Sequence, residues 1–412
     1  MADNKDKKVL KSSIERELSQ TCLNSAEREK IKGSTNLNVP HLRFPEFRGE
    51  WEEHTLSEYL EFKNGLNPDA KRIGNGLPFI SVMDVLSEGV IRYDNIRGKV
   101  DATEKEIECF GVKNGDILFQ RSSETLEDVG RANVYMDDRT AIYGGFVIRG
   151  RKIGNYDTMF FKFLLATPLA RKSTCRMGAG AQHFNIGQEG LSKISLFFPH
   201  IEEQRKIASL LSLIDQRIAT QNKIIDKLQS LIKGLRVRLI QIENGNIVHL
   251  GEIAQIYQPQ TISSTELTED GFLVYGANGI IGKYKEYNHK TEQICITCRG
   301  NTCGMVNYTK PMSWITGNAM VINTDAHQDK VCKRYLYHYL SAYNFNRIIS
   351  GSGQPQIVRT PLEQLKVTLP TISEQKQKAL FLDKIQDKID LNHKVLNLNI
   401  RQKQYLLRQM FI

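Results

Sequence analysis

The most constraining feature of this sequence is an internal repeat. The hexapeptide Pro199-His-Ile-Glu-Glu-Gln204 recurs 171 residues later as Pro370-Thr-Ile-Ser-Glu-Gln375. A repeat of this period in a chain of 412 residues predicts two copies of one structural unit. Chain length agrees, because a single hydrophobic core rarely serves more than about 250–300 residues. We therefore expect two similar domains.

A long proline-free segment follows each hexapeptide, with apolar residues spaced three, four and seven apart. This spacing places them on one stripe of a helix, and its persistence over about five heptads is typical of a coiled coil. The first stripe comprises Ile207, Leu211, Ile214, Ile218, Ile225, Leu228, Leu231, Leu235 and Leu239. The second comprises Leu382, Ile385, Ile389, Leu396 and Leu406. Each copy should end in one long helix.

Polar residues interrupt both stripes at matching places, Gln221-Asn222 and Asn392-His393, again 171 residues apart. A buried polar residue in such a seam fixes the register and orientation of the partner helix at some cost in stability. The same residues could instead lie outside the seam. The sequence leaves both interpretations open.

The repeat extends upstream of the helices in weaker form. Gly115–Ser123 resembles Gln293–Asn301, and both are predicted strands that run into an arginine, Arg121 or Arg299. Short β-branched and aromatic runs between Gly and Asn turns indicate mixed sheet. The expected fold class is α+β, with two pseudo-repeated α/β domains that each precede a long helix. We predict a poorly ordered N-terminal extension over 1–38, a first domain over 39–198, a first helix over 199–245, a second domain over 246–369 and a second helix over 370–412.

Composition narrows the class of partner. The formal net charge of +10 favours an anionic partner, of which nucleic acid is the commonest, although a basic charge can also serve only solubility. No apolar run reaches the ~20 residues of a membrane span, and residues 1–13 lack the apolar core of a secretory signal, so we expect a cytoplasmic protein. Seven scattered cysteines predict free thiols.

Motifs for several chemistries are missing. The sequence has neither the glycine-rich loop and Asn/Asp-Pro-Pro-aromatic tetrad of an adenine methyltransferase nor a phosphate-binding Gly-x-x-x-x-Gly-Lys-Ser/Thr loop. Pro68-Asp69 lacks the Asp/Glu-x-Lys partner of a nuclease. Cys295 and Cys298, with Cys303 and His289 nearby, have zinc-like spacing, but residues three apart on a strand face opposite sides. We predict no catalytic centre and no metal site.

The duplicated order of these motifs resembles a known family. The opening segment Leu42–Leu56, the two Gly-rich stretches that lead into the hexapeptides, and the two domain-plus-helix halves are similar to the specificity subunits of bacterial type I restriction-modification enzymes. The opening segment resembles staphylococcal members in particular. The resemblance covers the chain from about residue 39 to its C-terminus.

The resemblance implies a noncatalytic subunit that binds double-stranded DNA. Each domain would be a target recognition domain that reads one half of a split, asymmetric site, and the two helices would pair antiparallel as a spacer between the domains. The expected partners are two modification methyltransferase subunits and two restriction subunits, with no membrane partner. S-adenosylmethionine, ATP and Mg would bind these partner subunits, and this chain would bind no cofactor itself.

A domain that reads duplex DNA needs Arg or Lys for phosphate and guanine, and Asn or Gln for adenine. The candidates in the first domain are Lys63, Asn64, Arg121, Ser122, Ser123, Arg131 and Gln182. Those in the second are Gln258, Gln260, Tyr275, Asn278, Lys283, Arg299, Asn301, Gln354 and Gln356. Arg121 and Arg299 are favoured, because equivalent placement would direct both guanidinium groups to one face; a structural ion pair is the alternative. Gln182 and Gln354 could instead bond backbone near the helix junction.

Two other functions compete with this hypothesis. A coiled-coil scaffold or regulator would have the same helices, but its domains would bind protein instead of DNA. A self-contained restriction enzyme would need the motifs that are missing. A basic, DNA-facing surface on both domains would favour the specificity subunit over the scaffold.

Overall fold

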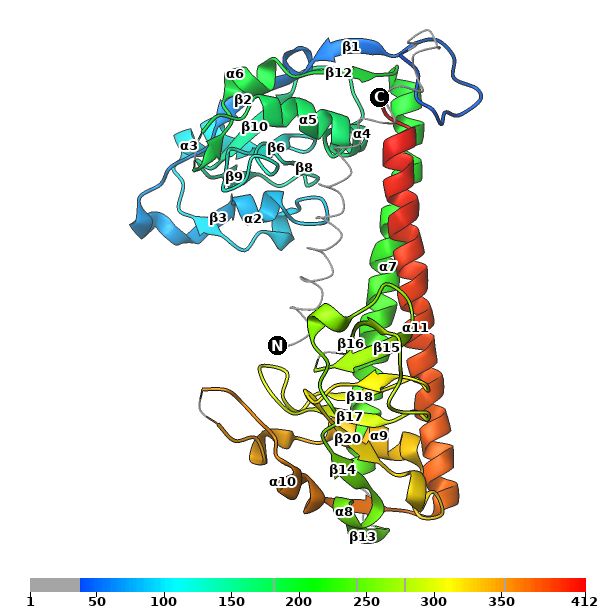
Figure 1. Ribbon diagram of the computed structural model, residues 1–412. Helices are drawn as coiled ribbons and strands as arrows, with labels where there is room; N and C mark the ends of the chain where they lie inside the picture. The colour runs from blue at the N-terminus through cyan, green and yellow to red at the C-terminus, as the bar shows by residue number, and fades with distance from the viewer. Residues whose placement is uncertain (1–37, 181, 242–243, 278, 352) are drawn as a thin grey trace. The chain divides into compact units, whose positions relative to one another are not determined.

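The computed structural model describes residues 38–180, 182–241, 244–277, 279–351 and 353–412 (Figure 1). The predicted N-terminal extension therefore lies outside the described residues, except for residue 38. The chain divides into two compact units. Unit 1 runs to Leu213 and includes Gln402–Ile412, and unit 2 comprises Ile214–Arg401.

Unit 1 is an α+β domain built around short strands. Its strands are β1 (Glu52–Thr55), β2 (Leu60–Asn64), β3 (Ile73–Ile80), β4 (Lys99–Val100), β5 (Gly111–Val112), β6 (Ile117–Gln120), β7 (Ser122–Ser123), β8 (Ala132–Val134), β9 (Ala141–Tyr143), β10 (Val147–Lys152), β11 (Phe184–Asn185) and β12 (Ser195–Phe198). Its helices are α2 (Val82–Val85), α3 (Glu104–Phe110), α4 (Thr158–Leu165), α5 (Pro168–Arg176), α6 (Gln188–Ser192) and the start of α7 (Ile201–Ile240).

Unit 2 has the same kind of inventory. Its strands are β13 (Asn246–His249), β14 (Gln255–Tyr257), β15 (Phe272–Gly276), β16 (Gly279–Tyr284), β17 (Ile294–Thr297), β18 (Val306–Tyr308), β19 (Trp314–Ile315), β20 (Ala319–Asn323) and β21 (Lys366–Leu369). Its helices are α8 (Leu250–Ile253), α9 (Lys333–Ala342), α10 (Arg359–Glu363), the rest of α7 and most of α11 (Ile372–Gln409).

Strand order shows that the two units share one topology. The central antiparallel sheet has the order β2-β10-β6-β8 in unit 1 and β14-β20-β17-β18 in unit 2. A parallel pair accompanies it in each unit, β3 with β9 and β15 with β19. A third, two-stranded sheet joins β1 to β12 and β13 to β21. The predicted fold class is thus confirmed, including the duplication.

The glutamine that ends each hexapeptide joins the long helix to its domain. In unit 1, Gln204 donates to the Pro199 carbonyl at 2.8 Å and accepts at 3.0 Å from the N–H of Asp157, the residue that caps α4. In unit 2, Gln375 donates to the Pro370 carbonyl at 2.9 Å and accepts from the Cys332 N–H, which caps α9, at 2.9 Å. Both glutamines are buried. The repeated motif is therefore a structural joint.

We expect Gln375→Ala to lower the free energy of unfolding of unit 2 by about 1–3 kcal/mol, because the substitution leaves buried polar groups without partners. The carbonyl of Lys330, which also accepts from the Gln375 amide at 3.1 Å, would be one of them. Gln364→Ala is the matched control, since Gln364 is exposed. Urea unfolding followed by circular dichroism measures both; equal midpoints would contradict the joint.

The glutamate beside each glutamine has a different role in each copy. Glu374 closes a capping box at the start of α11, where it accepts from the Thr371 N–H at 3.0 Å. Glu203 is instead buried and accepts two hydrogen bonds of 2.7 Å from the guanidinium of Arg43. The opening segment of the chain is thereby tied to the start of α7.

Helices α7 and α11 lie side by side within unit 2 (Figure 1) and share its main hydrophobic core. They run antiparallel, since Gln221 of α7 bonds Asn392 of α11, and Arg236 bonds Gln386 at 3.3 Å. Ile232 and Leu239 of α7 pack with Leu382 and Ile389 of α11 in that core. The predicted pairing of the helices is confirmed.

The prediction that Leu231 belongs to the buried stripe of α7 is wrong. Leu231 is 49% exposed, and the adjacent Ile232 lies in the seam at 4% exposure. Ile232 stands seven residues after Ile225 and seven before Leu239, so it keeps the heptad spacing that Leu231 breaks. Ile207, Leu211, Ile214 and Ile225 are buried, and Ile218, Leu228, Ile385 and Leu396 are half-buried.

The polar interruption of the stripes lies in the seam. The Gln221 amide donates to the backbone carbonyl of Asn392 at 3.3 Å and also to its side-chain oxygen. Gln221 and Asn392 occupy equivalent positions of the two copies, so the two long helices contact each other there through the same position of the repeat. A polar contact here disfavours slipped helix registers, in which an amide would be buried without a partner.

The C-terminal end of α11 belongs to the core of unit 1. Phe411 stacks on Phe160 at a centroid distance of 5.3 Å, and Trp51 contacts both rings edge-on at 6.2 Å. The Leu42 N–H donates to the Gln409 carbonyl at 2.8 Å. Unit 1 is therefore completed by residues from the far end of the sequence. Among the described helices, none is both long and apolar enough to cross a membrane.

Candidate nucleic-acid interface

Three segments of unit 1 meet where β6 ends. The Arg121 N–H donates to the Phe146 carbonyl at 2.9 Å, and the Ile186 N–H donates to the Arg121 carbonyl at 3.0 Å. The end of β6 is thus flanked by the turn before β10 and by the Gly-rich loop 178–186. We call this the strand-end surface of unit 1; it comprises residues 121–123, 144–146 and the described part of 178–186.

Polar side chains gather on this surface. Arg121 is half-buried, and its Nη1 donates to the Gly145 carbonyl at 3.3 Å. A guanidinium has five donors, so this contact leaves most of them available to a ligand. Ser122 donates to the side-chain oxygen of Asn185, which is exposed. Gln182, within the Gly-rich loop, is exposed. The surface offers both positive charge and hydrogen-bonding groups.

The equivalent surface of unit 2 is identified by the same hydrogen bonds. The Cys298 N–H donates to the Asn318 carbonyl at 3.2 Å, and the Ile357 N–H donates to the Cys298 carbonyl at 3.0 Å. The strand-end surface of unit 2 therefore comprises residues 298–301, 316–318 and the described part of 350–357. Arg299, Asn301, Gln354 and Gln356 on it are exposed.

This register corrects the expected equivalence of the two arginines. Cys298 stands where Arg121 stands, and Arg299 corresponds to Ser122, because Arg299 bridges Gln356 as Ser122 pairs with Asn185. A shift of one residue on an extended chain sends side chains to opposite faces. The two arginines lie on equivalent surfaces but are not presented in the same way.

Asn64 and Gln258 are a further matched pair of amides. Asn64 is the last residue of β2, and Gln258 directly follows the equivalent strand β14. The Gln258 amide donates to the Gly317 carbonyl at 3.2 Å, in the turn before β20. Gln258 therefore borders the strand-end surface of unit 2. Gln260 nearby is exposed.

Most of the other candidate residues are engaged in contacts within their own unit. Lys63 donates to the Cys109 sulfur at 3.0 Å, Arg131 pairs with Asp128 at 2.7 Å, and Lys283 pairs with Asp270 at 3.3 Å. Tyr275 is 6% exposed and accepts from the Lys310 N–H at 3.1 Å, so burial removes it from the set of accessible residues. Ser123 pairs with Phe184 and is half-buried. Asn278 lies outside the described residues.

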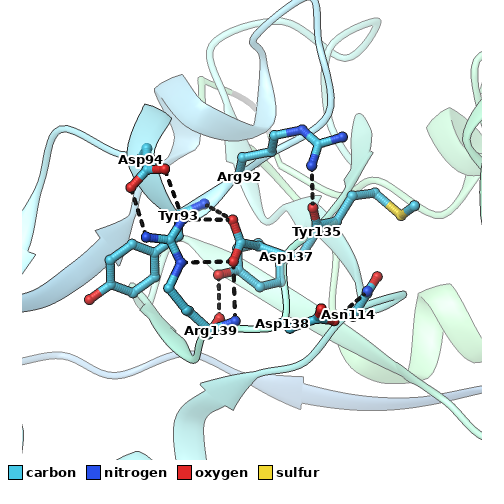
Figure 2. Close-up of polar contacts among 9 residues, drawn as sticks. Arg92, Tyr93, Asp94, Asn114, Tyr135, Asp137, Asp138 and Arg139 are labelled. Carbon is cyan, nitrogen blue, oxygen red and sulfur yellow. Dashed lines mark hydrogen bonds and ion pairs between the residues drawn. The ribbon is translucent and has the colours of Figure 1, made fainter.

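A separate polar cluster of unit 1 shows what an internally satisfied arginine looks like (Figure 2). Arg139 makes two hydrogen bonds to Asp94, at 2.8 and 2.9 Å, and others to Asp137 at 3.1 Å. Its guanidinium also lies 4.2 Å from the ring centre of Tyr93. Hydrogen bonds from Arg139 hold the pKa values of Asp94 and Asp137 below their usual range. Two carboxylates around one guanidinium do not favour a phosphate.

The cysteines of unit 2 do not form a zinc site. Cys295 packs in a core with Tyr275 and Val321, whereas Cys298 belongs to the core shared with the long helices. The two thiols thus point to opposite faces of β17, and burial raises the pKa of Cys295. The six cysteines in the described part of the chain are free, and no three metal-binding side chains come together there.

Comparison with known proteins assigns the family. The family model of the type I restriction modification DNA specificity domain matches residues 48–230 and 243–399. The putative type I restriction enzyme MjaX specificity subunit of Methanocaldococcus jannaschii is 25% identical, over 87% of this chain and 92% of its own length. The EcoprrI specificity subunit of Escherichia coli is 33% identical over 140 residues, which are 33% of this chain and 34% of the relative.

A solved structure shows the same fold. The type I restriction-modification S subunit from M. genitalium superimposes with a TM-score of 0.64 at 18% identity, covering 91% of this chain and 99% of that one. These sequence relatives are archaeal and enterobacterial, so the staphylococcal likeness of the opening segment stays a prediction. Since the family model matches more than half of the chain, in two consecutive stretches, this chain belongs to the type I restriction modification DNA specificity family and is a noncatalytic specificity subunit.

Proposed function

We propose that each unit reads one half of a bipartite, asymmetric DNA site through its strand-end surface. The observation that carries the proposal is the recurrence of this surface: the same backbone hydrogen bonds hold it in both units, while its exposed side chains differ. A shared scaffold with different contact residues is what two half-sites of different sequence require. The net charge of +10 adds the attraction to phosphate that all duplex binding needs.

The long helices act as the spacer in this proposal. Helix α7 has 40 residues and therefore a length of about 60 Å at 1.5 Å per residue. That length corresponds to somewhat less than two turns of B-DNA, at about 34 Å each. Helix length would then set the number of unspecified base pairs between the half-sites.

The partner subunits would bind the outer faces of the helices. Leu391 and Leu398 of α11 are 59% and 63% exposed and lie seven residues apart, on one face. Ile224 and Leu231 of α7 repeat this spacing and are also exposed. Apolar stripes left open on a paired helix fit a further helix of a partner. We assign them to two methyltransferase subunits, which would carry S-adenosylmethionine; ATP and Mg would belong to two restriction subunits.

The decisive experiment is to co-express this chain with its methyltransferase subunit and to map N6-methyladenine in the host genome by single-molecule sequencing. We expect a split motif, two short half-sites around a fixed unspecified spacer, that is absent without this chain. If a stable complex forms but no new motif appears, the scaffold hypothesis replaces the proposal.

Arg121→Ala and Arg299→Ala should act on different half-sites. Each substitution is expected to weaken binding of the cognate duplex by about 1–3 kcal/mol and to relax specificity only in its own half. Fluorescence anisotropy with duplexes altered in one half-site at a time measures this, and each variant is the control for the other. Equal losses on every duplex would make both arginines phosphate contacts.

A further inference from the structure

The turn before β10 presents a large aromatic side chain to solvent. The Val147 N–H donates to the Gly144 carbonyl at 2.9 Å, so Gly145 and Phe146 are the central residues of a tight turn. Phe146 is 68% exposed. Its carbonyl accepts the Arg121 N–H, which places the ring on the strand-end surface of unit 1.

The support under Phe146 is rigid. The Gly144 N–H donates to the Ile80 carbonyl at 3.0 Å, and the Gly65 N–H donates to the Val147 carbonyl at 3.2 Å. The backbone of Gly144 approaches Gly65 so closely that a β-carbon at position 65 would collide with the Gly144 carbonyl. A turn held from both sides keeps its exposed side chain in one place, which is a requirement for reading bases.

Unit 2 builds the same turn with a different side chain. The Ala319 N–H donates to the Thr316 carbonyl at 3.0 Å, and the Thr316 N–H donates to the Tyr275 carbonyl at 2.9 Å, as Gly144 does to Ile80. Asn318 therefore takes the position of Phe146, and it is also exposed. One protruding position thus carries a phenyl ring in unit 1 and an amide in unit 2.

From this placement we propose that Phe146 and Asn318 are specificity-determining residues that contact base edges in the two half-sites. Phe146 packs against the 5-methyl group of a thymine, and Asn318 makes hydrogen bonds to N6 and N7 of an adenine. The inference rests on the proposed function, because it names the contacts by which the same surfaces read DNA.

The chemistry of the two side chains supports this assignment. A phenyl ring cannot bond a phosphate, so on a DNA-facing surface its favourable contact is with an apolar group, and the thymine methyl is the apolar group of the major groove. The amide of Asn318 carries a donor and an acceptor side by side, which matches the adenine edge. Arg121 and Arg299 on the same surfaces would bring the positive charge.

The test uses the full chain in complex with its methyltransferase subunit and duplexes of the mapped motif. Thymines of the first half-site are replaced one at a time by uracil, which removes only the 5-methyl group. The unmodified chain should lose about fourfold in affinity at one position, the value of one apolar carbon. The Phe146→Ala chain should bind the duplexes with and without that methyl group with the same affinity. Ile153→Ala is the matched control, since Ile153 is 59% exposed just beyond the other end of β10 and should behave as the unmodified chain does.

The second arm replaces adenines of the second half-site by 7-deazaadenine, which lacks the N7 acceptor. A loss of at least about fivefold is expected for the unmodified chain at one position, whereas Asn318→Ala should bind the duplexes with and without that replacement equally well. The inference is overturned, while the proposed function stands, if both substituted chains lose as much affinity as the unmodified chain on every base replacement. The same holds if the first half-site has no thymine on either strand. If the unmodified complex prefers no sequence, the proposed function fails, and this inference with it.

Discussion

Removing Tyr405–Ile412 is expected to unfold unit 1 and to leave unit 2 folded. The deletion takes Leu406, Met410 and Phe411 out of the unit 1 core, where they are 8%, 2% and 3% exposed. Burial of such side chains contributes about 1.5–3 kcal/mol each, so the loss is at least about 5 kcal/mol. A whole domain is stable by only about 5–15 kcal/mol. The residues of unit 2 end at Arg401 and stay in place.

Hydrogen exchange with peptide resolution separates the two units in this experiment. Peptides from β6 and β10 should lose their protection, whereas those from β17 and β20 should keep it. The point variant Phe411→Ala should show the same selectivity at a cost of about 3–5 kcal/mol. Tyr405→Ala, at a 58% exposed site of the same helix, is the control. Unchanged protection of β6 in the truncated chain would show that the end of α11 does not complete unit 1.

The duplication could be predicted because the residues that repeat determine local structure. The hexapeptide marks a helix start, and the apolar spacing that follows is a helical pattern whatever lies around it. The completion of unit 1 by Phe411 could not be predicted in the same way. Trp51 and Phe411 are 360 residues apart in a sequence that carries no signal of their contact.

The candidate site was predicted in outline but not in register. Matching the strands by residue type aligns Arg121 with Arg299, because both are arginines that follow an apolar strand. The hydrogen bonds place it opposite Cys298, because backbone pairing, and not side-chain identity, defines equivalent positions in two sheets. Phe146 could not be predicted for a related reason: an aromatic residue beside a strand usually belongs to the core, and only the structure shows that this one is exposed.

The two units fasten their domain helix to the long helices with different chemistry. In unit 1, α4 contributes Phe160 to an aromatic cluster with Trp51 and Phe411. In unit 2, α9 contributes His338, which is fully buried and accepts at Nδ1 from Arg236 of α7 at 3.0 Å. Its Nε2 lies 2.8 Å from Asp383 of α11. One histidine therefore joins three helices, and both of its ring nitrogens are engaged when it is neutral.

Asp383→Ala should consequently destabilise unit 2 by about 3 kcal/mol at neutral pH. The carboxylate, 22% exposed, also accepts from Nε of Arg334 at 2.9 and 3.0 Å. Its removal takes the carboxylate from the half-buried guanidinium of Arg334 and leaves the buried Nε2 of His338 without its acceptor, whereas Nδ1 of His338 keeps its hydrogen bond from Arg236. Asp387→Ala is the matched control, one turn further along α11 at an exposed position. Thermal unfolding followed by circular dichroism measures the difference in stability between the two variants. Hydrogen exchange of peptides from β17 shows whether unit 2 is the unit that is destabilised.

The dependence of this defect on pH separates charge from packing. Burial raises the pKa of Asp383, but hydrogen bonds from His338 and Arg334 outweigh it, so the pKa lies below its ordinary value of 3.8. A carboxylate whose pKa is lowered by folding contributes stability above the unfolded pKa and loses it as the pH falls through the folded value. The part of the difference between the unmodified chain and Asp383→Ala that comes from the carboxylate should therefore be complete at neutral pH and should shrink below about pH 4. Burial lowers the pKa of His338 and its hydrogen bond to Asp383 raises it, so the two chains also differ in how His338 titrates below its ordinary pKa of 6.5. A difference that stays constant down to pH 3 would mean that Asp383 acts through packing alone. The contact of α9 with the long helices would then be no more electrostatic than the aromatic contact of α4 in unit 1.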